Sequence, residues 1–231
     1  MKYFKGLIHA DTGTGKTHLA GTMAQVVKTF HICIDDFAED TLATIPGDRV
    51  IRRPTTFAQL VEYHKFLATG KHDFGGWCLD SITQGIQNFR VERSGVTAGD
   101  YFKTAMPTWM EMYERWRLIS KDYIALPMHG MILAMSQREL NELEPGTKEN
   151  PNYVVKPFIE TKLRDTIGGY LPALGYCFKQ YEGGRNKYFL TFERGGIDTK
   201  LCGVSIPTME DPTFEKIWNL IQKQNKSEEK A

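Results

Sequence analysis

A short stretch near the N-terminus, HADTGTGKTH at residues 9–18, constrains the fold of this chain more than any other feature. It matches the phosphate-binding loop pattern G-x-x-x-x-G-K-[ST] except at its first position, where Ala10 replaces glycine. The apolar run 3–9 precedes the loop, and residues 15–27 follow it with apolar side chains at helical spacing. Strand, glycine-bearing loop and helix in this order predict an α/β fold with a phosphate site after the first strand.

The residues of the loop suit this chemistry. Two glycines permit tight curvature and a close backbone approach to an anion. Lys16 is expected to reach the β and γ phosphates of a nucleotide, and Thr17 to give its hydroxyl to Mg²⁺. Ala10 adds only a methyl group at the strand–loop junction, so we interpret it as a tolerated variant. The residues expected to contact ATP are Asp11, Thr12, Gly13, Thr14, Gly15, Lys16, Thr17 and His18.

An aspartate further along the chain is the expected second metal ligand. Asp80 ends the apolar run 75–82, GGWCLDSI, which predicts a third buried strand. In P-loop proteins a carboxylate at this place holds Mg²⁺, often through water, beside the threonine of the loop. We therefore predict that Thr17 and Asp80 hold the metal. The alternative is a strand-end aspartate that caps the next helix.

Two further polar side chains are candidates for handling the attacking water and sensing the γ-phosphate. Acidic residues crowd the end of the strand predicted at 30–35, and among them Glu39 has the reach for a water beside the γ-phosphate. Gln137 ends the strand predicted at 130–137, where an amide could sense the γ-phosphate. A solvated acidic turn and an ordinary polar strand end stay open as alternatives. The predicted catalytic set is Lys16, Glu39, Asp80 and Gln137.

The remaining patterns predict alternating strands and helices. Helices are expected at 57–70, 107–124 and 214–223, a short strand at 49–52, a polar loop at 138–157, and a hairpin of 175–182 with 186–196. We predict one domain over residues 1–222, with a mostly parallel sheet, helices on both faces and a C-terminal antiparallel hairpin. Residues 223–231 are predicted to form a flexible tail.

Composition narrows the functional classes. The net charge is +1, so any site for a polyanion must be a local patch. The four cysteines form no C-x-x-C pair, which argues against zinc, and three of them lie in apolar runs typical of buried, reduced thiols. No apolar run approaches the roughly 20 residues needed to cross a bilayer. With no signal-peptide pattern at the N-terminus, these features favour a cytoplasmic protein without a membrane partner.

Several segments together resemble a known family. They are ADTGTGKT, IDDFAED, WCLDSI and ILAMSQ, with TKLRDTIGGYLPALGYCFK and KYFLTFERGG downstream, and they resemble the phage-encoded AAA-type ATP-binding proteins with a RecA-like core. The resemblance covers about residues 3–207, and the phosphate loop and Asp80 are its specific signals. Two positions depart from the family pattern, Ala10 and Gln137, which stands where many relatives have histidine.

The resemblance implies a RecA-like P-loop ATPase that takes ATP and Mg²⁺, assembles as a ring or filament, and works in the host cytoplasm. Some members of the family serve as minimal single-strand-annealing recombinases, so single-stranded DNA and a single-strand-binding protein are implied partners. Hydrolysis at a subunit interface is also implied, with Lys162 and Arg164 as candidates to reach a neighbour's γ-phosphate.

In RecA-like proteins two loops face single-stranded DNA, and the matching regions here are about 86–106 and 138–157. The first mixes Arg90, Arg93 and Lys103 with aromatic side chains, a combination that suits stacked bases and phosphates. These three residues are the candidate DNA contacts, against the alternative of a flexible connector. The second region is charge-balanced, so its basicity does not support DNA binding.

Two other functions use the same loop. A nucleotide or nucleoside kinase would carry an arginine-rich lid, and region 138–157 has one arginine among many acids, which counts against that function. A nucleotide-switched module that never touches DNA is the other alternative. Both stay open at the level of the sequence.

Overall fold

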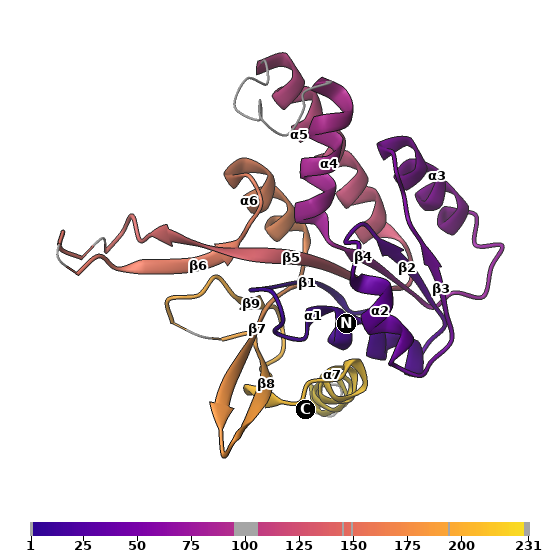
Figure 1. Cartoon of the computed structure of the whole chain (residues 1–231). Coiled ribbons are helices and arrows are strands. Elements are labelled where there is room, and N and C mark those ends of the chain that lie inside the picture. The colour runs from indigo at the N-terminus through magenta and orange to yellow at the C-terminus, as the bar shows by residue number, and fades with distance from the viewer. Residues whose placement is uncertain (1, 95–105, 145, 149, 194, 229–231) are drawn as a thin grey trace.

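The computed structural model describes residues 2–94, 106–144, 146–148, 150–193 and 195–228 as one sheet flanked by helices (Figure 1). Its strands are β1 (Lys5–Ala10), β2 (Thr29–Cys33), β3 (Arg49–Arg52), β4 (Gly76–Asp80), β5 (His129–Leu140), β6 (Tyr153–Pro157), β7 (Ala173–Glu182), β8 (Arg185–Thr191), β9 (Lys200–Leu201) and β10 (Met209–Glu210). Its helices are α1 (Lys16–Gly21), the 3₁₀ helix η1 (Thr22–Gln25), α2 (Ala38–Ala43), α3 (Phe57–Ala68), α4 (Ile82–Ser94), α5 (Met106–Ala125), α6 (Thr161–Tyr170) and α7 (Phe214–Glu228).

The sheet runs in the order β10-β8-β7-β1-β5-β4-β2-β3, with β6 paired to β5 and β9 to β7. β1 pairs in parallel with β5 on one side and with β7 on the other. β4 lies two strands from β1 in one direction and β8 lies two strands away in the other. The predicted α/β architecture, a mostly parallel sheet with an antiparallel hairpin, is confirmed. The loop after β1 therefore lies in the middle of the sheet's carboxyl edge.

Two apolar layers cover the faces of the sheet. One lies under α3, α4, α5 and α6, which cover the same side of the sheet (Figure 1). Trp77 and Trp116 are among its buried side chains. The other contains α1, η1 and α7, packed around Met23 and Phe214. β1 contributes side chains to both layers, and all six of its residues are buried, so its apolar residues do not alternate strictly with polar ones. Among the described helices, none combines the length and apolar character of a membrane span.

Local sequence explains several element ends. Thr56 and Gln59 form a reciprocal capping box at the start of α3, which satisfies amides that the helix itself leaves free. The β7–β8 hairpin turns through Gly183 and Gly184, whose φ angles of 60° and 81° suit a two-residue turn that other residues adopt poorly. The predicted hairpin is thus confirmed at its turn.

The fold departs from the sequence prediction on either side of α5. Residues 86–94, expected in a DNA-facing loop, belong to α4, because Ile82, Ile86 and Phe89 recur at helical spacing and are buried. The rest of that region, 95–105, lies outside the described residues. The region 138–157 was expected to be a loop, but β5 continues to Leu140 and pairs with β6.

The last helix also differs from its expected extent. α7 continues to Glu228, into the segment that the sequence pattern assigned to a tail. Its first turns pack against η1 through the apolar layer around Phe214 and Ile217.

Candidate functional site

The loop between β1 and α1 curls around the ammonium group of Lys16. Gly13 and Gly15 have φ angles of 71° and 92°, in the left-handed region that favours glycine. Lys16 Nζ donates hydrogen bonds to the carbonyls of Ala10 and Asp11, each at 2.9 Å. Burial lowers the pKa of Lys16, and the negative charge of Asp80 opposes that shift. The ammonium group of Lys16 is thus bound to two backbone carbonyls of the loop itself.

Ala10 occupies the last position of β1. It is fully buried, and its methyl group belongs to the apolar layer that α1 and α7 cover. Its carbonyl accepts a hydrogen bond from Lys16. The side chain that replaces the motif's first glycine therefore packs into the core beside the loop.

Thr17 and Asp80 come together at the carboxyl edge of the sheet. Thr17 Oγ1 donates to Asp80 Oδ2 at 2.7 Å, joining the first turn of α1 to the end of β4. Asp80 is 2% exposed, and burial raises its pKa to about 6, with the charge of Asp35 adding to the shift. The hydroxyl of Thr17 and the ammonium of Lys16 oppose it. A carboxylate this deeply buried is costly to keep charged without a cation beside it.

The Thr17–Asp80 pair fits magnesium. Both donors are oxygens, and Mg²⁺ in nucleotide sites takes one or two protein oxygens and completes its shell with phosphates and water. Within the described residues no three His, Cys, Asp or Glu side chains cluster as metal ligands, so a site made by protein atoms alone is absent there. The capping alternative for Asp80 finds no support, because Ser81 Oγ is the side chain that accepts from Gln84 at the start of α4.

Glu39 lies in the first turn of α2. Its carboxylate accepts a hydrogen bond from Arg53 Nε at 2.5 Å. The neighbouring Asp35 is more closely linked to the site, because its amide donates to the carbonyl of Asp80 at 3.1 Å. Its charge also raises the pKa of Asp80. The catalytic set predicted from the sequence includes Glu39 and leaves Asp35 out, although Asp35 has the described contact with Asp80.

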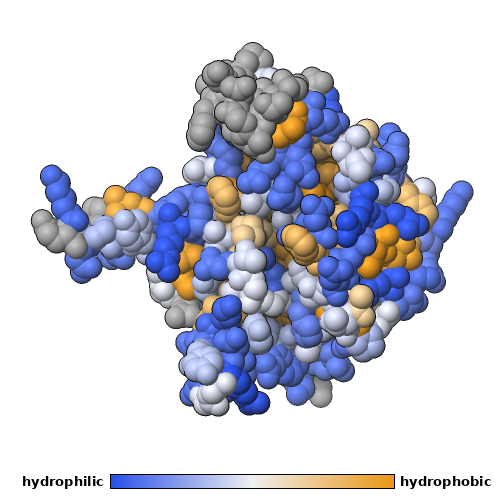
Figure 2. All heavy atoms as spheres, viewed as in Figure 1, coloured by the Kyte–Doolittle hydropathy of each residue, from blue (hydrophilic) through white to orange (hydrophobic). Residues whose placement is uncertain are grey.

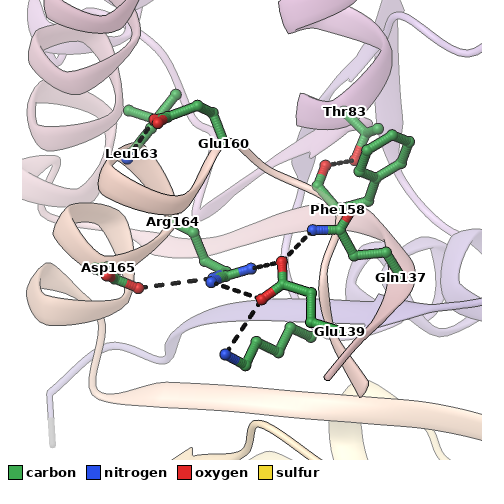
Figure 3. Close-up of polar contacts among 9 residues, drawn as sticks. Thr83, Gln137, Glu139, Phe158, Glu160, Leu163, Arg164 and Asp165 are labelled. Carbon is green, nitrogen blue, oxygen red and sulfur yellow. Dashed lines mark hydrogen bonds and ion pairs between the residues drawn. The ribbon is translucent and has the colours of Figure 1, made fainter. Parts of the chain in front are cut away.

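Gln137 lies inside β5, opposite Lys156 of β6, where the sequence pattern had placed the end of a strand. Its Nε2 donates to Glu139 Oε1 at 2.5 Å, as Figure 3 shows. Glu139 also accepts from Arg164, whose Nη1 and Nη2 lie 2.7 and 3.3 Å from its two oxygens. Arg164 is 5% exposed and is held by this pair, whereas Lys162 is exposed.

The candidate DNA residues are only partly described. Arg90 lies on α4, and its guanidinium carbon is 4.3 Å from the ring centre of Trp109 on α5. Arg93 belongs to the same helix, but its side chain lies outside the described residues, as does the whole of Lys103. The structure therefore places Arg90 on a packed helix and not on a loop.

The β5–β6 hairpin projects from the body of the molecule (Figure 2). Its exposed apolar side chains are Leu140, Leu143 and Tyr153, and Leu143 is 93% exposed. The polar cluster at its base, Gln137–Glu139–Arg164, ties the hairpin to α6. This arm lies within the region 138–157, where the sequence pattern predicts a loop.

Two residues of the β7–β8 hairpin lie against the phosphate loop, and sequence reasoning missed both. A Cβ atom built on Gly15 would lie 3.5 Å from Tyr188 Cδ1, and one built on Gly13 would lie 3.8 Å from Lys179 Nζ. Lys179 and Tyr188 are directly opposite each other in the hairpin register. Counting outward from the two-residue turn Gly183–Gly184 would have paired them, which was the available signal.

No protein-family model and no curated protein matches this chain. Solved structures do. A KaiC-like protein from the hyperthermophilic archaeon Pyrococcus horikoshii is 11% identical over 90% of this chain and 83% of its own, with a TM-score of 0.53. The RadB recombinase is 12% identical over 90% of this chain and 86% of its own, with a TM-score of 0.50. The chain has a RecA-like fold. At this identity the likeness speaks to the fold alone.

Proposed function

We propose that this protein binds Mg-ATP at the loop between β1 and α1 and hydrolyses it to ADP and phosphate. The observation that carries the proposal is the hydrogen bond from Thr17 to Asp80, between residues 63 positions apart in the chain. A buried carboxylate beside a hydroxyl, with the ammonium of Lys16 close by, is the oxygen and charge arrangement that Mg-triphosphate requires.

Each part of the site has a role in this proposal. The backbone amides of residues 11–18 bind the phosphates, and Lys16 turns from its two loop carbonyls toward the β and γ phosphates. Thr17 and Asp80 hold the metal. A magnesium ion held there would supply positive charge that offsets the negative charge of the phosphates.

Glu39 is proposed to position the attacking water, with Arg53 fixing its carboxylate, and Asp35 is the second candidate for that role. Gln137 is proposed to sense the γ-phosphate by exchanging its hydrogen bond to Glu139 for one to a phosphate oxygen. Because Glu139 also binds Arg164, that exchange would alter the contact between the β5–β6 arm and α6.

The proposed partner is single-stranded DNA, in phage-type recombination or repair in the host cytoplasm. Arg90, Arg93 and Lys103 are the proposed contacts, and one protein of similar fold is named a recombinase. The proposed active form is a homo-oligomer, a ring or filament, in which exposed Lys162 reaches the neighbouring site. A single-strand-binding protein is the proposed accessory partner.

Measuring ATP turnover with and without a short single strand tests this function. We expect turnover that single-stranded DNA increases and that Lys16→Ala removes. Phosphate transfer to a nucleoside or nucleotide would instead make the protein a kinase. Slow turnover that ignores DNA would make it a nucleotide switch, and turnover that survives Lys16→Ala would remove the loop from the reaction.

A further inference from the structure

A cavity adjoins the phosphate loop on the β8 side. Its volume is about 480 Å³, within the range of small-molecule sites. Its lining includes Gly13, Gly15 and His18 of the loop and helix α1, Tyr188 of β8, and Pro212, which precedes α7. The loop residues in this lining were expected to contact ATP. Tyr188 and Pro212 were not expected from the loop motif.

We propose that this cavity receives the nucleoside half of the nucleotide, with its base stacked on the ring of Tyr188. This inference rests on the proposed function, since it concerns the same ligand at the same loop. It assigns the cavity a ligand class, an aromatic base joined to a ribose. It also assigns Tyr188 the contact that favours a nucleotide over a bare triphosphate.

The order of the sheet gives the direction of the ligand. The metal end of a triphosphate belongs at Thr17 and Asp80, and Asp80 ends β4, two strands from β1. Tyr188 lies on β8, two strands from β1 on the opposite side. A triphosphate lying along the loop with its γ end toward β4 therefore leaves its nucleoside end toward β8, where the cavity lies.

Tyr188 is suited to stacking because its ring is both fixed and accessible. It lies against Gly15, where a Cβ would approach Cδ1 to 3.5 Å, yet the residue is 37% exposed. A flat aromatic face beside a polar loop stacks on any base, since every base has a π-face.

The walls of the cavity are held by backbone hydrogen bonds. The amide of Asp211 donates to the carbonyl of Tyr188 at 2.8 Å, which fixes β8 to the segment before α7. The amide of Phe214 donates to Thr22 Oγ1 at 2.8 Å, which fixes the start of α7 to η1. The cavity is thus formed by the fold itself, and a base entering it has little ordering cost to meet.

The hairpin also supplies a matched control. Tyr181 lies two residues from Lys179 along β7 and so shares the face of Tyr188, but farther from the loop. It is 76% exposed and is not among the residues that line the cavity. Replacing it removes an aromatic ring from the same hairpin without touching the proposed base site.

The test compares the binding of Mg-ATP and Mg-tripolyphosphate, which lacks the nucleoside, by isothermal titration calorimetry. Wild-type protein should bind Mg-ATP more tightly. Tyr188→Ala should weaken Mg-ATP roughly 5- to 150-fold and leave Mg-tripolyphosphate unchanged, while Tyr188→Phe and Tyr181→Ala should behave as wild type.

Three results would overturn the inference. Equal wild-type affinities for the two ligands would mean that the nucleoside makes no contact, a result that needs no variant to fold. A Tyr188→Ala variant that is folded by circular dichroism and weakens both ligands equally would make the ring a support of the loop. If wild type bound neither ligand, the proposed function would fail and the base site with it. If wild type bound Mg-tripolyphosphate as tightly as Mg-ATP, the phosphate site would stand and only the base site would fail.

Discussion

The phosphate loop and the base of the β5–β6 arm each contain a buried cation near a carboxylate. The two charged groups bond each other at the arm, whereas at the loop each bonds other groups. At the arm, Arg164 bonds both oxygens of Glu139, and this contact lowers the pKa of Glu139. At the loop, Lys16 bonds two carbonyls while Asp80 bonds Thr17, and the pKa of Asp80 is raised to about 6.

This difference separates a structural pair from a site built for a ligand. At the arm the two charges satisfy each other, so the pair links β5 to α6. At the loop neither charge is satisfied by the other, and a perturbed carboxylate beside a cation is typical of a functional site. An anion and a metal ion arriving together would satisfy both charges.

The largest effect is expected at Lys16. Lys16→Ala should weaken Mg-ATP about 100-fold or more, because charge-assisted hydrogen bonds to phosphate are lost. Calorimetric titration measures this. Lys28→Ala is the control, since Lys28 forms a surface ion pair with Asp73. Equal affinities for the two variants would place the nucleotide away from the loop.

The next largest effect is a dependence of the unfolding free energy on pH, caused by the raised pKa of Asp80. Its folded pKa of about 6 lies above the ordinary 3.8, so the folded state binds the proton more tightly. Stability from this group is complete below about pH 4 and is lost as the pH rises to about 6, by up to about 3 kcal/mol. The difference in unfolding free energy between wild type and Asp80→Asn, from urea melts across this range, should follow that curve. A difference that stays constant with pH would mean that Asp80 is not buried as described.

At the arm, the larger change should be in stability, with a smaller change in nucleotide affinity passed through the hydrogen bond between Glu139 and Gln137. Glu139→Ala leaves the guanidinium of Arg164 buried without its carboxylate, which should cost about 2 kcal/mol, less than a fully buried pair because Glu139 is partly exposed. Urea denaturation measures the cost, and Glu142→Ala, at an exposed position beyond the strand, is the control. A loss of Mg-ATP affinity in Glu139→Ala would show that the two regions are coupled, as the sensing role of Gln137 requires.

The smallest effect is expected on DNA. Replacing Arg90 and Arg93 together with alanine should reduce the salt slope of single-strand binding by about 1.4, since each phosphate contact contributes about 0.7. Fluorescence anisotropy of a labelled strand at several salt concentrations measures the slope. An unaltered slope would move the DNA path to another surface, such as the β5–β6 arm.

The sequence best predicts those parts of the fold whose conformation depends on residues close together in the chain. The unit from β1 through the loop into α1 was predicted because glycines, lysine and threonine act there through their own backbone. The β7–β8 hairpin was predicted because Gly183 and Gly184 favour its turn. In both cases the deciding residues are neighbours in the chain.

What the sequence does not predict depends on partners far along the chain. Residues 86–94 look like a loop until α5 provides the surface on which Phe89 is buried. Gln137 looks like a strand end because β6, which extends its strand, is separated from it by a polar segment. Tyr188 joins the site only through the order of the strands, which local patterns do not give.

The most direct test of the central claim is a crystal structure with Mg²⁺ and a non-hydrolysable ATP analogue. We predict a triphosphate against the amides of residues 13–17, Lys16 at its β and γ phosphates, and magnesium held by Thr17 and Asp80, directly or through water. A nucleotide bound elsewhere, or a loop in which Lys16 keeps its two carbonyls and Asp80 keeps Thr17 without any ligand at saturating nucleotide, would contradict the account.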